Sequence, residues 1–201
     1  MRDALTKKQA QQLLESVKGK DVAAKRDLAV LNILIRCGLR SIEIERADIG
    51  DIRFQKGTPV LFVHGKGRDS KDEFVVLTQK ALSTIQDYLS LRGVTTQHDP
   101  LFGSHGNRCD QERSGRFHTR SIRRMVKKHL KNIGLNNARL TCHSLRHTFA
   151  TLAFENNAPL LAVQKAMRHS NINSTLIYTH LLDRLTNGAE TYIDLETNSE
   201  A

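Results

Sequence analysis

Four polar side chains near the C-terminal end have the chemistry that a phosphodiester reaction requires. His143, Arg146, His169 and Tyr178 lie within residues 141–182. A guanidinium can bind two non-bridging oxygens at once, an imidazole can donate hydrogen bonds or relay a proton, and a phenol can attack phosphorus covalently. Because protein cations then stabilise the developing charge, no metal is required. The alternative is that His143 and Arg146 only cap and solvate a helix, and their spacing leaves both interpretations open.

Three helices are expected to position these side chains. The first begins near Thr141, and His143 and Arg146, three residues apart, should share a face away from its apolar stripe. That stripe consists of Leu145, Phe149, Leu152 and Ala153. A second, short helix should begin near Pro159, where a missing N–H is tolerated. Its buried side should be formed by Leu160, Val163 and Met167. A third helix, capped by Asn173 or Ser174, should carry Tyr178.

The rest of the chain predicts a mostly α fold with a small antiparallel β-sheet, that is, an α+β domain. Thr6 and Gln9 form a capping box for a helix over residues 6–18. Asp21 is expected to cap a second helix, which Gly38 should end. Short alternating apolar runs over 49–78 indicate the sheet. Further helices are expected over 79–92, after Thr78, and over 119–133, with a polar loop across 94–118.

Composition favours a polyanionic partner without proving one. The chain has 201 residues, 31 Lys and Arg against 21 Asp and Glu, and a net charge of +10. Such a balance suits DNA, although a merely basic protein would look the same. No stretch approaches the roughly 20 apolar residues of a membrane span, and no secretory signal opens the sequence. The unevenly spaced Cys37, Cys109 and Cys142 are interpreted as reduced thiols of a cytosolic protein.

The C-terminal motifs resemble the signature of the tyrosine recombinase (phage integrase) family. The strings are H-x-x-R-H, then A-V-Q-K-x-M-x-H-S, then I-x-S-T-x-I-Y-T-H, all within about forty residues. One departure is Arg168, where family members usually carry Gly. Two further strings match the family, G-L-R-x-x-E at residues 38–43 and the Gly65-Lys66-Gly67 turn. The resemblance extends from about residue 5 to about residue 185 and implies the catalytic-domain fold of tyrosine recombinases.

The resemblance also implies roles for individual residues. Tyr178 would attack a scissile phosphate and leave a 3′-phosphotyrosyl bond, and Lys66 would protonate the leaving 5′ oxygen. Glu43 would support the site. The complete catalytic set would be Arg40, Lys66, His143, Arg146, His169 and Tyr178. Taken alone, Arg40 would be an ordinary surface residue and Lys66 a solvated hairpin lysine, because the P-loop pattern is absent. Neither a metal nor another cofactor is expected.

Basic residues elsewhere are candidates for DNA contacts. The predicted helix 119–133 is strongly basic, and a solvated face and contact with the DNA backbone both fit that pattern. The expected DNA-binding residues are Arg68, Arg120, Arg123, Arg124, Lys127 and Lys128. The spacing of His98, His105, Cys109 and His118 matches no structural zinc site. Compared with the family, residues 107–117 are expected to be an insertion.

The resulting hypothesis is a site-specific DNA recombinase or integrase that acts in DNA integration, excision or inversion. A single catalytic domain would span residues 1–201 without the usual N-terminal core-binding domain, so the chain is either a fragment or a short recombinase. Residues 183–201 would dock on a neighbouring protomer or pack on their own domain. The protein is expected to be a monomer when free and a homotetramer on synapsed double-stranded DNA, in a bacterial cytoplasm near the nucleoid. A type IB topoisomerase-like enzyme and a non-catalytic DNA-binding regulator remain alternatives.

Overall fold

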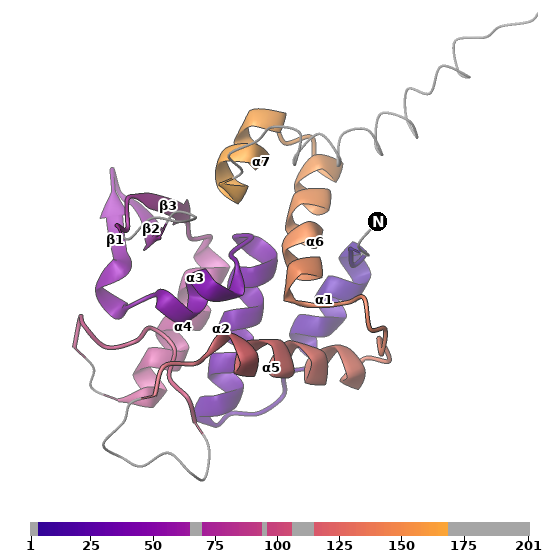
Figure 1. Ribbon diagram of the computed structural model, residues 1–201, viewed down its shortest axis with the longest axis horizontal. Coiled ribbons are helices and arrows are strands. Elements are labelled where there is room, and N and C mark those ends of the chain that lie inside the picture. Colours follow the sequence, from indigo (N-terminus) through magenta and orange to yellow (C-terminus); the bar gives the residue numbers. More distant parts are fainter. Residues whose placement is uncertain (1–3, 65–69, 94–95, 106–114, 169–201) are drawn as a thin grey trace, which may run out of the picture.

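The computed structural model describes residues 4–64, 70–93, 96–105 and 115–168, which form a helical domain with a small sheet at one side (Figure 1). The elements in chain order are α1 (Lys7–Glu15), α2 (Val22–Arg36), α3 (Ser41–Arg46), the 3-10 turn η1 (Ile49–Asp51), β1 (Ile52–Gln55), β2 (Thr58–Val63), β3 (Glu73–Val76), α4 (Gln79–Arg92), α5 (Thr119–Asn132), α6 (Cys142–Glu155) and α7 (Leu160–Met167). This arrangement confirms the predicted α+β fold class.

Side-chain caps begin the first helices where the sequence predicts them. Thr6 accepts the backbone N–H of Gln9 at 3.2 Å, and the Gln9 side chain accepts that of Thr6 at 2.9 Å, which completes the capping box. Asp21 accepts the N–H of Ala24 at 2.9 Å and caps α2. The predicted end of α1 at residue 18 is wrong, because α1 ends at Glu15 and Ser16 is its C-cap.

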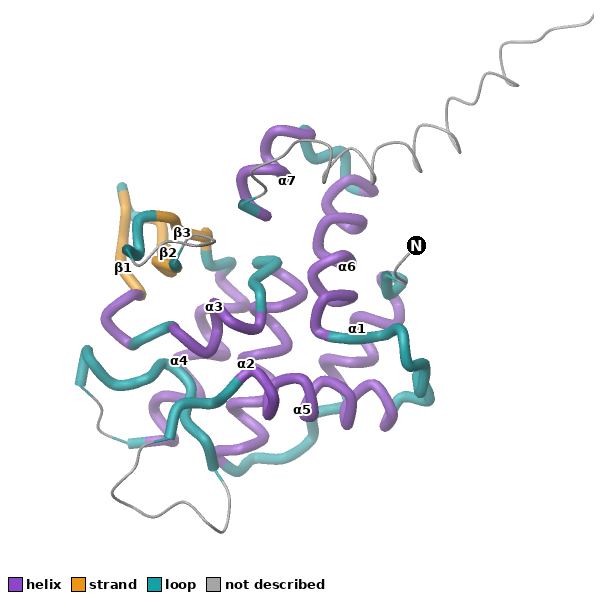
Figure 2. The backbone as a smooth tube through the Cα atoms, in the orientation of Figure 1, coloured by secondary structure: helices purple, strands orange, loops and turns teal. Residues whose placement is uncertain are grey.

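The sheet has three antiparallel strands in the order β1-β2-β3 (Figure 2). Ile52 pairs with Leu61, and Leu61 pairs with Val75, so these three residues share one face. Leu61 and Val75 are buried in the main core. On the opposite face, the guanidinium of Arg53 lies 4.7 Å from the ring centre of Phe62, which packs against Phe74. The sheet therefore contributes to the main core cluster through the first face, although Val60 on the opposite face is also buried.

The main core surrounds α2, which contributes the fully buried Leu31, Ile33 and Leu34. The described parts of the segment between α4 and α5, residues 96–105 and 115–118, form a loop as predicted, but they are not uniformly polar. Leu101, Phe102 and Phe117 from this loop are 0%, 1% and 4% exposed and belong to the same core. Phe117 belongs to the predicted insertion 107–117, so at least this residue has a role in packing.

The last described helix packs in a second, smaller cluster. Val163 and Met167 of α7 contact Ala150 and Phe154 of α6, and this cluster is distinct from the main core. Figure 1 shows α7 beyond the C-terminal half of α6, on the side of the molecule where the sheet also lies. Pro159 is the N-cap of α7 rather than its first helical residue. Among the helices that the structure describes, none is long and apolar enough to cross a membrane.

Candidate active site

The junction between α2 and α3 positions Arg40. Gly38 follows the C-cap of α2 with a φ of +61°, a left-handed conformation that glycine adopts without strain. Arg40 is then the N-cap of α3, and the Glu43 side chain reaches back to accept its backbone N–H at 2.6 Å. Glu43 also accepts a 2.8 Å hydrogen bond from Nη1 of Arg40. The Arg40 side chain is 27% exposed, so it is held from one side and open to solvent on the other.

Helix α6 positions Arg146 in the interior. Thr141 caps the helix by accepting the N–H of His143 at 3.2 Å. Arg146, one turn further, is 1% exposed and is among the largest fully buried side chains. Its Nη1 donates to the carbonyl of Gly38 at 2.5 Å, and its Nη2 donates to the carbonyl of Met167. The solvated-helix alternative is therefore wrong for Arg146, because α7 and the α2–α3 junction cover it.

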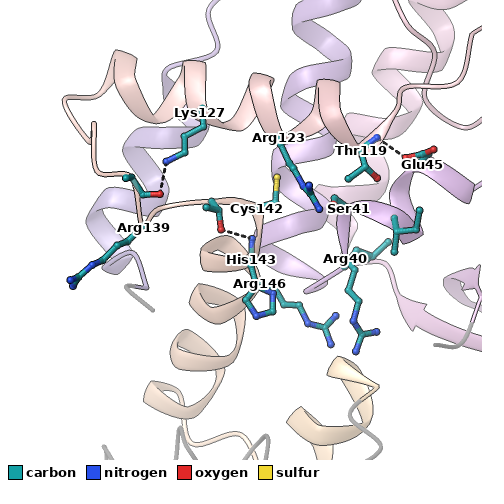
Figure 3. A pocket seen from close by; sticks show the side chains of 14 residues that line it. Arg40, Ser41, Glu45, Thr119, Arg123, Lys127, Arg139, Cys142, His143 and Arg146 are labelled. Carbon is teal, nitrogen blue, oxygen red and sulfur yellow. Dashed lines mark hydrogen bonds between the residues drawn. The ribbon is translucent and has the colours of Figure 1, made fainter. Parts of the chain in front are cut away.

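The two arginines converge on the C-terminal end of α7. Nη2 of Arg40 donates to the carbonyls of Met167 and Arg168, at 3.5 and 3.3 Å, and Arg146 donates to the same Met167 carbonyl. In Figure 3 the guanidiniums of Arg40 and Arg146 lie side by side and point toward α7. Carbonyls at a helix C-terminus lack intrahelical partners and carry partial negative charge, so they suit guanidinium donors.

A buried carboxylate, that of Glu43, lies next to these arginines. Glu43 is 4% exposed, and its oxygens lie 2.6 Å from Nη2 of Arg168, 2.8 Å from Nη1 of Arg40 and 4.0 Å from Nη1 of Arg146. Burial by itself would raise the pKa of Glu43, but the charge and hydrogen bonds of Arg168, with the backbone N–H of Arg40 and the charge of Arg146, outweigh it. The pKa of Glu43 therefore lies below its usual value, and the carboxylate is ionised at neutral pH.

His143 occupies the exposed side of the first turn of α6. Its ring lies edge-on to that of His147, with 4.5 Å between centroids. The two residues differ in burial, because the His143 side chain is exposed and that of Arg146 is buried. Both nevertheless line the same groove, so a ligand in the groove can reach both of them.

The groove has a volume of about 1410 Å³ and lies between α3, α5 and the start of α6 (Figure 3). Arg123 and Lys127, four residues apart on α5, line it, and Arg123 points into it. Lys127 also donates to the carbonyls of Asn137 and Ala138 at 2.8 and 3.1 Å. The remaining predicted contacts of this helix lie on a different, exposed stripe and do not line the groove; they are Arg120, Arg124 and Lys128.

Sequence reasoning missed one arginine of the groove. Arg139, which precedes the cap of α6, lines it but was not among the expected DNA-binding residues. Its position in the string R-L-T-C-H, just before the predicted helix start at Thr141, was the available signal. The neighbouring Cys142 is buried, and burial raises the pKa of its thiol to about 11, so the thiol remains protonated and weakly reactive at neutral pH.

Several expected site residues fall outside the described ranges. They are Lys66, Arg68, His169 and Tyr178. Of the residues considered for zinc, Cys109 also falls outside. His105 forms a 2.9 Å hydrogen bond with the Tyr88 hydroxyl, and His118 pairs with Glu45 at 3.2 Å, so these two rings have separate partners.

Sequence and structure comparisons agree on the class of the protein. The model of the phage integrase family matches residues 3–184, and the chain therefore belongs to this family. The tyrosine recombinase XerC of Caldanaerobacter subterraneus subsp. tengcongensis is 34% identical over 182 residues, which cover 89% of this chain and 47% of that protein. The chain thus spans about half the length of this curated relative.

Solved structures give the same result for the fold. The XerA recombinase superposes with a TM-score of 0.73 and 27% identity, covering 97% of this chain and 67% of that one. The XerH site-specific recombinase, in its post-cleavage complex with palindromic difH substrate, has a TM-score of 0.76 and 25% identity, covering 95% and 53%. The catalytic-domain fold expected from the sequence motifs is therefore confirmed.

Proposed function

We propose that this chain is the catalytic part of a site-specific DNA recombinase that cuts and rejoins strands through a 3′-phosphotyrosyl intermediate. The observation that carries the proposal is the convergence of Arg40 and Arg146, from helices distant in sequence, at one end of the groove. Two adjacent guanidiniums, which now donate to carbonyls at the end of α7, suit the non-bridging oxygens of a phosphate whose charge grows during attack. Membership of the phage integrase family supports the same reaction.

The proposed mechanism assigns one task to each side chain. Tyr178 attacks the scissile phosphorus, and the bond to the 5′ oxygen breaks as the phosphotyrosyl bond forms. Arg40 and Arg146 bind the non-bridging oxygens, and His143 and His169 donate hydrogen bonds or relay a proton. Lys66 protonates the departing 5′ oxygen. That 5′ hydroxyl then attacks the phosphotyrosine of a partner strand, so bond energy is conserved and no nucleotide cofactor is consumed.

The groove suggests how flanking DNA is held. Arg123, Lys127 and Arg139 line it beyond the two clamping arginines, and such side chains bind backbone phosphates without reading sequence. Arg68 and the second stripe of α5 are further proposed contacts. We infer that double-stranded DNA is the partner and that four copies assemble on two synapsed sites in a bacterial nucleoid. Residues 183–201 would then dock on the neighbouring protomer.

Trapping on a nicked suicide substrate tests this proposal. Loss of the short fragment after cleavage prevents religation, so the wild-type chain should accumulate a denaturation-resistant DNA adduct. Tyr178→Phe should bind DNA equally well and form no adduct, because only the phenol oxygen is removed. EDTA should not change the yield, since the proposed chemistry uses no metal.

The outcomes separate the alternatives. An adduct in the Phe variant would show that another residue is the nucleophile. Relaxation of supercoiled DNA without exchange between two sites would favour the topoisomerase-like alternative. DNA binding without any adduct in the wild type would favour a regulator.

A further inference from the structure

Arg168 has a left-handed backbone conformation, which is energetically unfavourable for a residue with a side chain. It is the C-cap of α7, with φ 51° and ψ 48°. In this left-handed region the Cβ atom crowds the backbone, so residues other than glycine rarely occupy it. Arg168 also stands where the family usually has Gly. Contacts of the Arg168 side chain can offset this cost.

The Arg168 side chain makes such contacts in the interior of the site. It is only 4% exposed. Its Nη2 donates to one oxygen of Glu43 at 2.6 Å, and its Nε donates to the other at 3.2 Å. This is a two-pronged arrangement that a planar guanidinium can form and an ammonium cannot. Nη1 donates to the carbonyl of Ala166 at 2.6 Å, which fixes the guanidinium on its own helix end.

These contacts join three separate parts of the fold. Glu43 belongs to α3 and supports Arg40, while Arg168 ends α7. Nε of Arg168 also lies 3.9 Å from a carboxylate oxygen of Glu73, the first residue of β3. Arg168, which directly precedes His169 in sequence, thus contacts both the helix capped by Arg40 and the strand that follows Lys66 in sequence.

The contacts of Arg168 matter for the position of α7, because this helix lies outside the main core. Its apolar residues Val163 and Met167 pack with α6 in the small cluster, which is separate from the main core. The polar contacts between the end of α7 and the α2–α3 region run through Arg40, Arg146 and Arg168. Arg40 and Arg146 donate there to carbonyls, and in the proposed reaction they must also bind phosphate. Arg168, with Glu43 as its main partner, can hold α7 in place throughout the reaction.

We propose that Arg168 is a positioning residue of the active site, which docks the C-terminal end of α7 on Glu43 and thereby fixes the geometry of the arginine pair. The effect on catalysis rests on the proposed recombinase function, whereas the docking does not. Arg168 acts through Glu43 and through the backbone, so it need not touch the substrate.

The test compares three variants with one control. Arg168→Met keeps the Cβ and most of the side-chain length but removes the fork, Arg168→Lys keeps the charge without the fork, and Arg168→Gly also relieves the backbone. Arg26→Met is the control, because Arg26 is a buried arginine, 6% exposed, that pairs with Asp27 of its own helix and bonds to Gly103. Each protein is assayed for amide hydrogen exchange, DNA dissociation constant and single-turnover cleavage of the suicide substrate.

Local docking predicts a specific pattern. In Arg168→Met, exchange over residues 160–168 should accelerate at least about tenfold while α4 keeps its protection. Cleavage should slow by about 10- to 100-fold, as small misplacements of reacting groups do, with an unchanged dissociation constant for DNA. The Gly variant should be similarly slow, and the Lys variant should recover part of the rate. Arg26→Met should leave exchange over residues 160–168 unchanged.

Several results would overturn the inference. One is an Arg168→Met variant whose amide exchange over residues 160–168 and whose cleavage rate both equal those of the wild type. If the Met and Gly variants fail to fold, the same result in Arg168→Lys would count. Another is equal acceleration of exchange in α4 and α7, which would mean a general loss of stability. Wild-type cleavage in the Gly variant would show that the side chain is dispensable. If the wild-type protein itself forms no adduct, the proposed function fails, while the exchange data still decide whether Arg168 docks α7.

Discussion

Replacing Glu43 by Gln should destabilise the fold strongly, because it removes the only carboxylate that bonds to both Arg40 and Arg168 among the described residues. The side chains of Glu43 and Arg168 are 3% and 4% exposed. Removing one partner of a buried ion pair typically costs about 3–5 kcal/mol, since the other charge stays buried without compensation. Gln preserves volume and one carbonyl oxygen, and the contact with the part-exposed Arg40 is screened, so we expect a loss of about 3 kcal/mol.

The assay is urea unfolding at pH 7, followed by far-UV circular dichroism because the chain contains no Trp. A domain of ordinary stability, about 5–15 kcal/mol, should remain folded after this loss. The exposed Glu15 of α1 provides the matched control, since Glu15→Gln removes the same charge from a solvated site and should change the unfolding free energy by less than about 0.5 kcal/mol.

The pH dependence gives a second measurement of the same interaction. Because the pKa of Glu43 is lower in the folded than in the unfolded state, its ionisation contributes stability that is complete above the unfolded value of about 4.3. This contribution is lost as the pH falls from there through the folded pKa. The difference between wild type and Glu43→Gln should therefore shrink below about pH 5. A difference under about 1 kcal/mol at pH 7, or one that does not depend on pH, would refute the reasoning.

Two further predictions concern Gly38 and Lys66. Gly38→Ala should lower the unfolding free energy in urea by about 2–3 kcal/mol, because the new Cβ would be strained at φ +61° and would lie 2.6 Å from Cδ1 of Phe149. The control is Gly134→Ala, at φ +79° with open space around it, which should cost only the backbone strain. Equal losses in the two variants would contradict the predicted clash. In single-turnover cleavage, Lys66→Ala should cut normal DNA slowly but a substrate with a bridging 5′-phosphorothioate almost normally, because the sulfur leaving group needs no proton. Equal defects on both substrates would exclude Lys66 as the general acid.

The helix starts were predictable because their signals are local. Thr6, Asp21 and Thr78 each cap a helix with a side-chain bond to a backbone N–H three residues later, and each was identified from residue type and the pattern that follows. The left-handed glycine at residue 38 was predictable for the same reason. The sheet followed from alternation and short turns. None of these features requires knowledge of which segments meet in space.

The burial of Arg146 was not predictable in this way. Helical periodicity places it beside His143, on a face without a continuous apolar stripe, and only the packing of α7 and Gly38 around it makes that position internal. The same holds for Phe117, which lies in a polar loop by composition but packs in the main core, where the Arg26 guanidinium lies 3.8 Å from its ring centre. Such contacts join residues far apart in the sequence, and no local pattern encodes them.

The role of Arg168 shows how a departure from a family pattern acquires meaning from structure. From the sequence it is only an arginine in place of the usual glycine. In the fold it adds a third guanidinium to the group formed by Arg40 and Arg146, so the positive charges around Glu43 outnumber its single negative charge. The carbonyls of Met167 and Arg168 offset part of this excess through their partial negative charge.

A phosphate that enters the groove would complete this charge balance. The attacked phosphorus gains negative charge as it becomes pentacoordinate, and guanidiniums already fixed by Glu43 need little reorganisation to stabilise it. If Arg168 supplies the permanent counter-charge for Glu43, then Arg40 and Arg146 can exchange their carbonyl partners for phosphate oxygens without leaving the carboxylate unpaired. In the proposed reaction, the charge that maintains the fold would thus be separate from the charges that bind the phosphate, and the fork of Arg168, rather than its charge alone, should determine the rate.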